Sequence, residues 1–297
     1  MISAVQLGQL DYGEGLRLQQ RLLDLRKAGN IGDVLLLLEH SPVITLGRNA
    51  KAANVLASTE VLAARGVEVF ECDRGGDVTF HGPGQLVGYP IFDLRQHDLR
   101  QHELRQCGAG ALARETAGAR KTLGVVDYVR RLEEVLIRTC ADFGIPARRV
   151  AGLTGAWTES ARVVSGLRPE CGSETRHHTA ADAEAEAKIA AIGVHISRSV
   201  TSHGFALNVN TDLSYFNLIV PCGITAKPVT SMQKELGREL DMSAVAESVS
   251  RNFGRVFASQ MLCVETVDAL LGNSVGVPLK APVELQRLRG EDEFFLG

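Results

Sequence analysis

Along the first third of the chain, the pattern of hydrophobic and polar residues has the period of a helix in one segment and the length or alternation of β-strands in the segments that follow. A helix is predicted over Asp11–Gly29 (DYGEGLRLQQRLLDLRKAG), because the pattern ends in cations followed by glycine, as helix C-termini prefer. Short apolar runs of strand length follow in DVLLLLEH and in Pro42–Gly47 (PVITLG). A half-buried strand is predicted over Val67–Cys72 (VEVFEC), where apolar and acidic residues alternate. Another strand is predicted over Gln85–Leu94 (QLVGYPIFDL), and its inner proline indicates a sheet edge or a bulge.

A second helix is predicted in the middle of the chain by an apolar stripe of helical period. The stripe consists of Tyr128, Leu132, Val135, Leu136, Cys140 and Phe143. Asp127 is the expected N-cap, and Gly144 and Pro146 supply the stop. Its place on the stripe makes Cys140 a core residue, since free cysteines usually pack as small hydrophobes.

The last third of the chain predicts two strands and a helix. The strands cover Ala187–Ser197 and Ser199–Asn210, and each contains a glycine that indicates close approach of another group. The helix covers Ser243–Phe257 and is amphipathic. Strands interleaved with helices predict an α/β (α+β) fold with a mixed β-sheet flanked by helices.

Two polar segments rich in small residues interrupt this pattern, at about 96–124 and 159–187. Their composition predicts surface insertions. No stretch has the character of a linker, so we expect a single domain over residues 1–297.

Composition limits the class of protein. The 45% hydrophobic and 23% charged content is typical of a globular chain, and the net charge of −3 argues against a nucleic-acid partner. The first residues lack the pattern of a secretory signal, and no apolar run is long enough to span a membrane. The six cysteines are scattered without metal or redox spacing, which favours free thiols in a reducing cytoplasm.

Four features could carry chemistry when taken singly. Cys222 stands between proline and glycine at the end of the apolar run YFNLIVPCGI, although most free cysteines are packing residues. A glycine-rich loop spans Asp73–Gln85 (DRGGDVTFHGPGQ), and either a ligand loop or a tight turn with a hydrogen-bonded histidine would fit it. Lys188 and His203 are expected to be an exposed lysine and a structural histidine.

A metal site is not expected. His177 and His178 are adjacent, but spacing supplies no further ligands to complete a site with them.

Together these segments resemble the signature blocks of lipoyl(octanoyl) transferases, which are octanoyl-[acyl-carrier-protein]:protein N-octanoyltransferases. The blocks are RGGDVTFHGPGQLVGYPIFDLR, KIAAIGVHISRSVTSHGFALNVNTDLSYFNLIVPCGI and TSMQKELGR. The resemblance extends from the first helix to the helix near Phe257 and leaves out the insertions and much of the tail. It implies a catalytic domain like that of biotin and lipoate protein ligases.

The resemblance also implies a set of site residues. The acyl-thioester cysteine falls on Cys222 and its partner lysine on Lys188. The implied acyl-binding residues are Arg74, Gly75, Gly76, Asp77, Val78, Thr79, Phe80, His81, Ala191, Ile192, Gly193, Gly204, Phe205 and Ala206. One departure is Ser199, which stands where relatives commonly carry a large aromatic residue. The shape of the pocket near Ser199 therefore does not follow from the resemblance.

The implied reaction moves an octanoyl or lipoyl group from a carrier thioester to a lysine amine, with no metal and no cofactor. A thiolate is the nucleophile and a nearby ammonium favours it, so we expect Lys188 to lower the pKa of Cys222 and to handle protons. The implied partners are octanoyl-acyl carrier protein, the lipoyl domains of 2-oxoacid dehydrogenase complexes and the glycine cleavage H protein. A basic rim for acidic partners is expected from Arg48, Lys51, Arg74, Arg148 and Arg149, which could equally be ordinary solvated charges.

Alternatives remain at this point. An ATP-dependent lipoate–protein ligase shares the expected fold but needs an adenylate site and no thioester cysteine. A transferase that takes its acyl group from another lipoyl-bearing protein would differ only in its donor. A non-catalytic relative would be expected to lose Cys222 or Lys188, and a cysteine hydrolase would need His81 or His203 as its base.

Overall fold

The computed structural model describes residues 1–97, 122–159, 186–221 and 227–270. Most of the two expected insertions, at about 96–124 and 159–187, lies outside the described residues, and so does Cys222. The single domain over residues 1–297 therefore stays a prediction.

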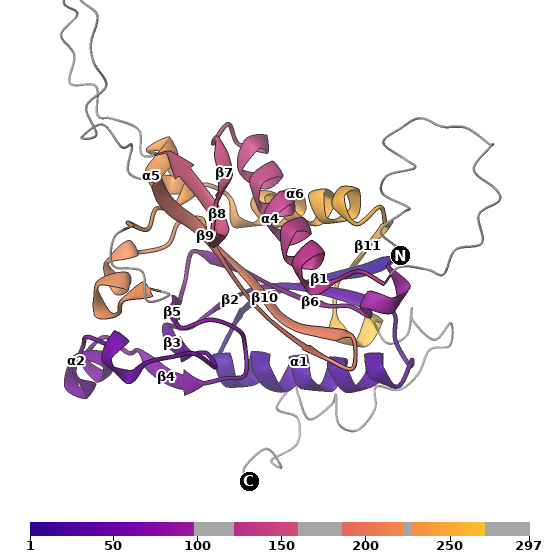
Figure 1. The fold of residues 1–297 in the computed structure, drawn as a ribbon, viewed down its shortest axis with the longest axis horizontal. Coiled ribbons are helices and arrows are strands. Elements are labelled where there is room, and N and C mark those ends of the chain that lie inside the picture. The colour runs from indigo at the N-terminus through magenta and orange to yellow at the C-terminus, as the bar shows by residue number, and fades with distance from the viewer. Residues whose placement is uncertain (98–121, 160–185, 222–226, 271–297) are drawn as a thin grey trace, which may run out of the picture.

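Eight strands form one mixed sheet in the order β11-β1-β2-β6-β10-β9-β8-β7 (Figure 1). The bounds along this order are β11 (Met261–Val264), β1 (Ile2–Leu10), β2 (Asp33–His40), β6 (Gln85–Ile91), β10 (Val200–Asn208), β9 (Glu186–Ser197), β8 (Leu153–Glu159) and β7 (Ala147–Val150). β1 pairs in parallel with both β2 and β11, and the remaining neighbours are antiparallel. The strands predicted at β2, β6, β9 and β10 are thus confirmed.

Helices cover both faces of this sheet (Figure 1). α1 (Tyr12–Lys27) packs on one face, where Leu18, Leu22 and Leu23 join a buried cluster with β2 and β6. α4 (Val125–Asp142) and α6 (Met242–Val256) pack on the other face. Each fully buried aliphatic or aromatic side chain contributes about 1.5–3 kcal/mol, so these two layers hold the sheet between them. The expected mixed sheet flanked by helices is confirmed.

The remaining elements are short and lie around the sheet. They are β3 (Val43–Leu46), η1 (Ala52–Asn54), α2 (Thr59–Ala64), β4 (Glu68–Glu71), β5 (Val78–His81), η2 (Leu94–Gln96), η3 (Leu213–Leu218) and α5 (Met232–Leu236). β4, β3 and β5 form a second, three-stranded sheet in that order. β4 is therefore an edge strand. The strand predicted there is confirmed, but the prediction that it is half-buried was wrong, because Val69 is 45% exposed and only Phe70 of this strand packs, against Tyr12 of α1.

Pro90 corrects the expectation of a sheet edge, because β6 lies in the centre of the large sheet between β2 and β10. The ladder between β6 and β10 is interrupted at this point, as the register places His203 opposite Pro90 and His203 has φ 55°. The amide of His203 donates instead to Gln19 Oε1 (2.8 Å) on α1. The carbonyl of Pro90 accepts from Thr201 Oγ1 (2.7 Å) in place of that amide. The central strand thus accommodates a residue without an N–H at a point where the backbone ladder is already open, with the remaining polar groups bonded to side chains.

The N-terminus of α4 also differs from the expectation. Gly124 occupies the cap position and Asp127 lies in the first turn, where a negative charge is favourable to the helix dipole. The stripe itself is confirmed, and Cys140 is fully buried in the core. The described cysteines Cys72, Cys140 and Cys263 are free thiols.

Candidate active site

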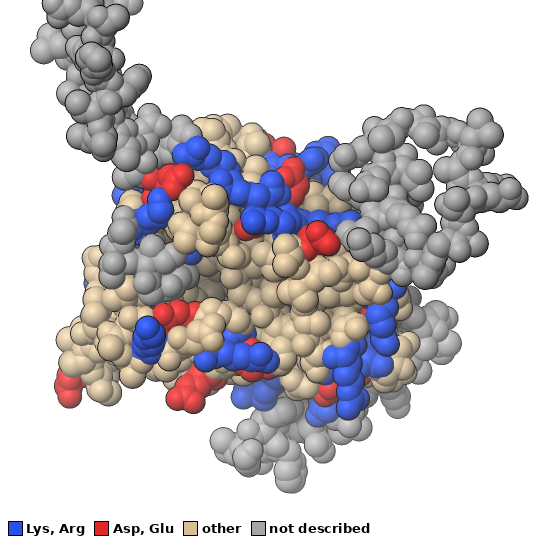
Figure 2. All heavy atoms as spheres, viewed as in Figure 1, with Lys and Arg blue, Asp and Glu red and all other residues tan. Residues whose placement is uncertain are grey.

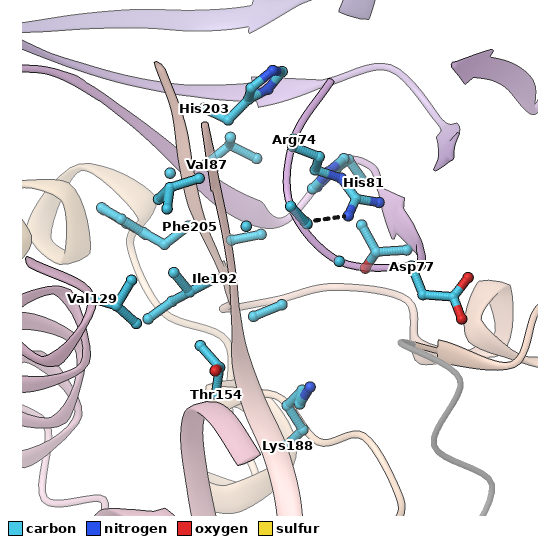
Figure 3. Close-up of a pocket in the computed structure, with 18 of the residues that line it drawn as sticks. Arg74, Asp77, His81, Val87, Val129, Thr154, Lys188, Ile192, His203 and Phe205 are labelled. Carbon is cyan, nitrogen blue, oxygen red and sulfur yellow. Dashed lines mark hydrogen bonds between the residues drawn. The ribbon is translucent and has the colours of Figure 1, made fainter. Parts of the chain in front are cut away.

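A cavity of about 350 Å³ lies where β9 separates from β8 (Figure 3). The ladder between these strands runs from Glu186 to Ala190, so the edge of β9 that faces β8 is not paired with it beyond that residue. The glycine-rich loop crosses this edge, and Gly75 N donates to Val194 O (3.0 Å). The cavity is thus enclosed by two strands and a loop that are far apart in the sequence.

Lys188 borders the cavity at one end and His203 at the other (Figure 3). Lys188 is only 9% exposed, so the expectation of a solvent-exposed lysine was wrong. The Nζ atom lies 4.8 Å from the ring centroid of Trp157, which is fully buried on β8. A cation at this distance from an indole face is attracted to it, so Trp157 fixes where the ammonium sits.

A second ammonium lies on the same indole. Lys227 Nζ is 5.8 Å from the Trp157 centroid and also forms an ion pair with Glu186. The segment that follows is paired with the backbone of Lys188 through Lys188 N to Pro228 O (2.8 Å) and Thr230 N to Lys188 O (2.9 Å). The lysine is therefore held by its backbone as well as by its ring contact.

The middle of the cavity is apolar. Val87, Ile192, Val194 and Phe205 line it together with the small residues Ala191 and Ala206. Phe205 lies over Gly88, where an added Cβ would be 2.1 Å from the phenyl ring. This pattern of a buried lysine at one end of an apolar channel suits a hydrocarbon chain with a reactive polar end near Lys188.

Arg74 holds the glycine-rich loop in place. It is 8% exposed, and its guanidinium donates to Thr45 O (2.7 Å), to Thr45 Oγ1 (2.9 and 3.1 Å) and to Gly75 O (3.2 Å). Gly193 has to be small, because a Cβ there would lie 2.8 Å from Gly75 O and 3.3 Å from Arg74 Cδ. The group predicted to approach the glycine of β9 closely is therefore the glycine-rich loop.

Most of the expected acyl-binding residues lie around the cavity, and two do not. Those bordering it are Arg74, Gly75, Gly76, Asp77, Thr79, His81, Ala191, Ile192, Gly193, Gly204, Phe205 and Ala206. Val78 and Phe80 point away from the cavity and pack in a separate core cluster with Ile44 and Phe216. β5 alternates its side chains between two faces, so a contiguous segment cannot line one cavity throughout.

His81 is held in one neutral form. Its Nδ1 lies 2.7 Å from Gln85 Oε1, and the amide nitrogen of Gln85 donates to Asn208 Oδ1 (2.8 Å) and to Phe80 O (3.2 Å). Gln85 Oε1 is therefore an acceptor, so the proton sits on His81 Nδ1. Burial, with the charges of His40 and Arg74 nearby, lowers the pKa of His81 to about 3.

A histidine–aspartate network at the other end was not foreseen. Asp73 accepts from His203 Nε2 (2.7 Å) and from His195 Nδ1, while Arg48 Nη2 donates to His195 Nε2 (3.0 Å). Register alone would put His203 on the face of its partner Val194, opposite to His195. The left-handed backbone of His203 redirects its ring, so both histidines reach one carboxylate.

Burial would raise the pKa of Asp73, but the hydrogen bonds and charges of His203 and His195 outweigh it and lower that pKa. Burial lowers the pKa of His203 in spite of this carboxylate. His195, the residue of this network on β9, lies about 23 Å along the strand from Lys188, seven residues at about 3.3 Å each, which is too far to exchange a proton with it.

Other residues that border the cavity were also missed: Tyr12, Val87, Tyr89, Val129, Gly152, Leu153, Thr154 and Val194. Tyr12 opens α1 and Val129 lies on α4, so no shared motif marks them. Ser199 lies in the turn between β9 and β10 with φ 67°, where its carbonyl accepts from Leu94 N (2.9 Å), and it does not border the cavity.

The expected basic rim is only partly present. Arg74 is buried and belongs to the loop, so its place on a rim was wrong. Arg148 pairs with Glu186 (3.1 Å), and Arg149 pairs with Glu133 (3.0 Å) and Glu134 (2.8 Å). Figure 2 shows Lys and Arg side chains gathered over α4 and β7, above a recess in the viewed face. Arg48 and Lys51 are exposed beside the glycine-rich loop.

Within residues 1–97, 122–159, 186–221 and 227–270, no three His, Cys, Asp or Glu side chains gather in a way that could hold a metal ion. In this same part of the chain, no helix has the length and apolar character needed to cross a membrane.

Comparison with solved structures supports the fold. A bipartite lipoate protein ligase with its E2 lipoyl domain, from Thermoplasma acidophilum, matches with a TM-score of 0.59 at 13% identity over 95% of this chain and 98% of that one. A lipoate-protein ligase A bound with ATP matches with a TM-score of 0.59 at 12% identity over 92% and 93%. At these identities the likeness concerns the fold alone.

Comparison of sequences is more specific. The model of the lipoyl protein ligase A/B catalytic domain matches residues 11–107 and 112–254. A protein named octanoyltransferase from Koribacter versatilis is 54% identical over the whole of both chains. Another from Acidobacterium capsulatum is 50% identical over 91% of this chain and 96% of its own. The chain therefore belongs to the lipoyl(octanoyl) transferase family, whose catalytic domain is that of the lipoyl protein ligases A and B.

Proposed function

We propose that this protein transfers an octanoyl group from acyl carrier protein to a lysine of lipoyl domains through a thioester on Cys222. The observation that carries the proposal is the buried Lys188 at the end of an apolar cavity, with its backbone paired to Pro228 and Thr230. Only five residues separate Cys222 from Pro228, which limits their separation to about 20 Å. The names of the curated relatives support the same chemistry.

The first half-reaction forms the acyl-enzyme. The Cys222 thiolate attacks the carbonyl carbon of octanoyl-carrier, a new C–S bond forms, and the bond to the carrier sulfur breaks. The departing carrier thiolate takes a proton from the Lys188 ammonium. The octanoyl chain lies along the apolar residues of β9 and β10, and each buried methylene contributes about 0.8 kcal/mol.

The second half-reaction forms the amide. The amine of the acceptor lysine attacks the thioester carbonyl, the C–N bond forms, and the Cys222 thiolate leaves. The neutral amine of Lys188 takes the proton that the nucleophile loses, so the ammonium and thiolate pair is restored. Conversion of a thioester to an amide is downhill, and no nucleotide enters either step.

The partners follow from this reaction. Octanoyl-acyl carrier protein is the proposed donor, and the lipoyl domains of 2-oxoacid dehydrogenase complexes and the glycine cleavage H protein are the proposed acceptors. Arg48 and Lys51 are the remaining candidates for contact with an acidic partner. The cytoplasm stays a prediction from the scattered cysteines.

An assay that varies the acyl donor separates this proposal from the alternative of an ATP-dependent ligase. The solved ligase structures share the fold of this chain, which does not by itself favour their reaction. A lipoyl domain is incubated with the protein and either octanoyl-carrier or octanoate with ATP, and the product is weighed by mass spectrometry. We expect the octanoyl-domain only with octanoyl-carrier. Modification with octanoate and ATP alone would establish the ligase reaction instead.

A further inference from the structure

Asp77 lies in the glycine-rich loop directly before β5 and joins the loop to the turn at η1. Its carboxylate accepts from Asn54 Nδ2 (2.5 Å), from Lys51 N (3.2 Å) and from Val78 N (2.8 Å). The loop is tied to the same region by its backbone, because Asn49 N donates to Gly76 O (3.1 Å). Asp77 therefore connects the cavity wall to a turn that lies outside the cavity.

Asn54 continues this connection to a third segment. Its carbonyl accepts from Val220 N (2.7 Å), and its neighbour Val55 forms an antiparallel bridge with Ile219. The carbonyl of Leu218 accepts from Leu56 N (2.8 Å) and from Ala57 N (3.2 Å). The chain up to Val220 is thus paired with the turn that Asp77 holds, and Pro221 and Cys222 come next in the sequence.

We propose that Asp77 and Asn54 form a clasp that positions the chain entering Cys222 against the wall of the acyl cavity. The clasp is defined as the hydrogen bond from Asn54 Nδ2 to Asp77 together with the hydrogen bond from Val220 N to Asn54 O. The inference rests on the proposed function, because it acts through the nucleophile named there. Both residues are positioning residues, and neither exchanges a proton with the substrate.

The chemistry of the carboxylate makes the clasp specific. All three partners of Asp77 are donors, and its carboxylate accepts from them with both of its oxygens. A carboxylate on residue 54 would oppose it with no proton between the two, whereas an amide on residue 77 could still pair if the Asn54 amide turned over to accept. A shift of about 1 Å in a nucleophile can lower a rate by about 100-fold, so a loosened clasp should act on the acylation step.

The test exchanges donor and acceptor. Asn54→Asp breaks the pair by opposing two carboxylates, whereas the double variant with Asp77→Asn restores it, with the amide on residue 77 donating to the carboxylate on residue 54. Asn54→Ala removes the donor without opposing two like groups. Asp212→Asn is the matched control, because this side chain caps η3 by accepting from Ser214 N and takes no part in the clasp.

Formation of the octanoyl-enzyme is followed by rapid quench and intact mass over a range of octanoyl-carrier concentrations. We expect Asn54→Asp and Asn54→Ala to lower the limiting rate by at least about 10-fold, with half-saturation changed by less than about 2-fold. The double variant should return to within about 3-fold of wild type, and the control should match wild type. Thermal melts confirm that each variant is folded at the assay temperature.

Single variants that acylate at the wild-type rate would overturn the clasp. So would a double variant as slow as Asn54→Asp, because that result assigns the effect to the charge on residue 54 and not to the lost hydrogen bond. Absence of any adduct on Cys222 in the wild-type protein would instead refute the proposed function. The two failures are therefore distinguishable.

Discussion

At the scale of single residues, burial holds the side chains beside the cavity in defined protonation states. His40 donates from Nδ1 to Leu10 O (2.9 Å) and lies 2.6 Å from the hydroxyl of Tyr89 through Nε2, and burial lowers its pKa to about 4. His81 is neutral for the same reason. A cysteine hydrolase with His81 as its base finds no support in this geometry, because a histidine with pKa about 3 is too weak a base at neutral pH.

These two histidines predict how stability changes with pH. Their pKa values in the folded protein are about 4 and about 3, below the ordinary 6.5, so the unfolded chain binds more protons between pH 6.5 and 4. The free energy of unfolding should therefore fall as pH decreases through this window, by about 1 kcal/mol per pH unit for each histidine. Above pH 7 they should have no effect.

Urea unfolding of wild type and His81→Asn between pH 4.5 and 8 tests this. The asparagine keeps a donor for Gln85 but removes the titrating group, so its stability should fall less steeply below pH 6.5. Parallel curves for the two proteins over the whole range would contradict the assignment.

Gly193 predicts a second effect at this scale. In Gly193→Ala the new methyl group would press on Gly75 O at 2.8 Å, so the loop must lift from β9. We expect octanoyl transfer to fall by about 10-fold or more, since the cavity wall moves. Gly32→Ala is the control, because nothing lies within 4 Å of its added Cβ. Equal activity of the two variants would show that the close approach is not needed.

At the scale of elements, the sequence predicted which segments are strands and helices better than it predicted where each strand lies in its sheet and which of its side chains are buried. The stripe on α4 and the paired strands β9 and β10 were found because their patterns depend on local periodicity. The central place of Pro90 was not, because it depends on His203 of another strand turning its amide toward Gln19. Val78 and Phe80 face the core because side chains alternate between the two faces of β5. A match to a contiguous motif takes no account of this alternation.

Glu133 is the main connection between α4 and the β7–β8 hairpin. It is fully buried and accepts from Arg130 (2.7 Å), Arg149 (3.0 Å) and Gly155 N (3.2 Å). Glu133→Gln should lower the free energy of unfolding by about 2 kcal/mol, because an amide replaces an acceptor of three donors.

Equilibrium urea unfolding measures this difference. Glu134→Gln is its control, since that side chain is 32% exposed and pairs with Arg138 and Arg149 at the surface, where ion pairs contribute at most about 1 kcal/mol. A loss in the control as large as in Glu133→Gln would refute a special role for the buried carboxylate.

At the scale of the whole molecule, the cavity gathers segments that lie up to 194 residues apart in the sequence, from Tyr12 to Ala206 (206 − 12). The motifs could name Lys188 and the glycine-rich loop, but not Trp157 under the ammonium or Asp73 between two histidines. Those contacts arise only when β8, β9 and the loop meet. The same convergence brings the two flanks of Cys222 to the site, one through Asn54 and Asp77 and one through Lys188.

The central claim is that Cys222 carries the acyl group with Lys188 as its proton partner. The most direct test mixes the protein with octanoyl-carrier, without acceptor, and maps the adduct by intact mass and peptide mass spectrometry. We predict one added octanoyl group on the Cys222 peptide of wild type, none in Cys222→Ser, and formation slowed by at least about 100-fold in Lys188→Met. An octanoyl group on another cysteine, or an adduct that persists in Cys222→Ser, would contradict the account.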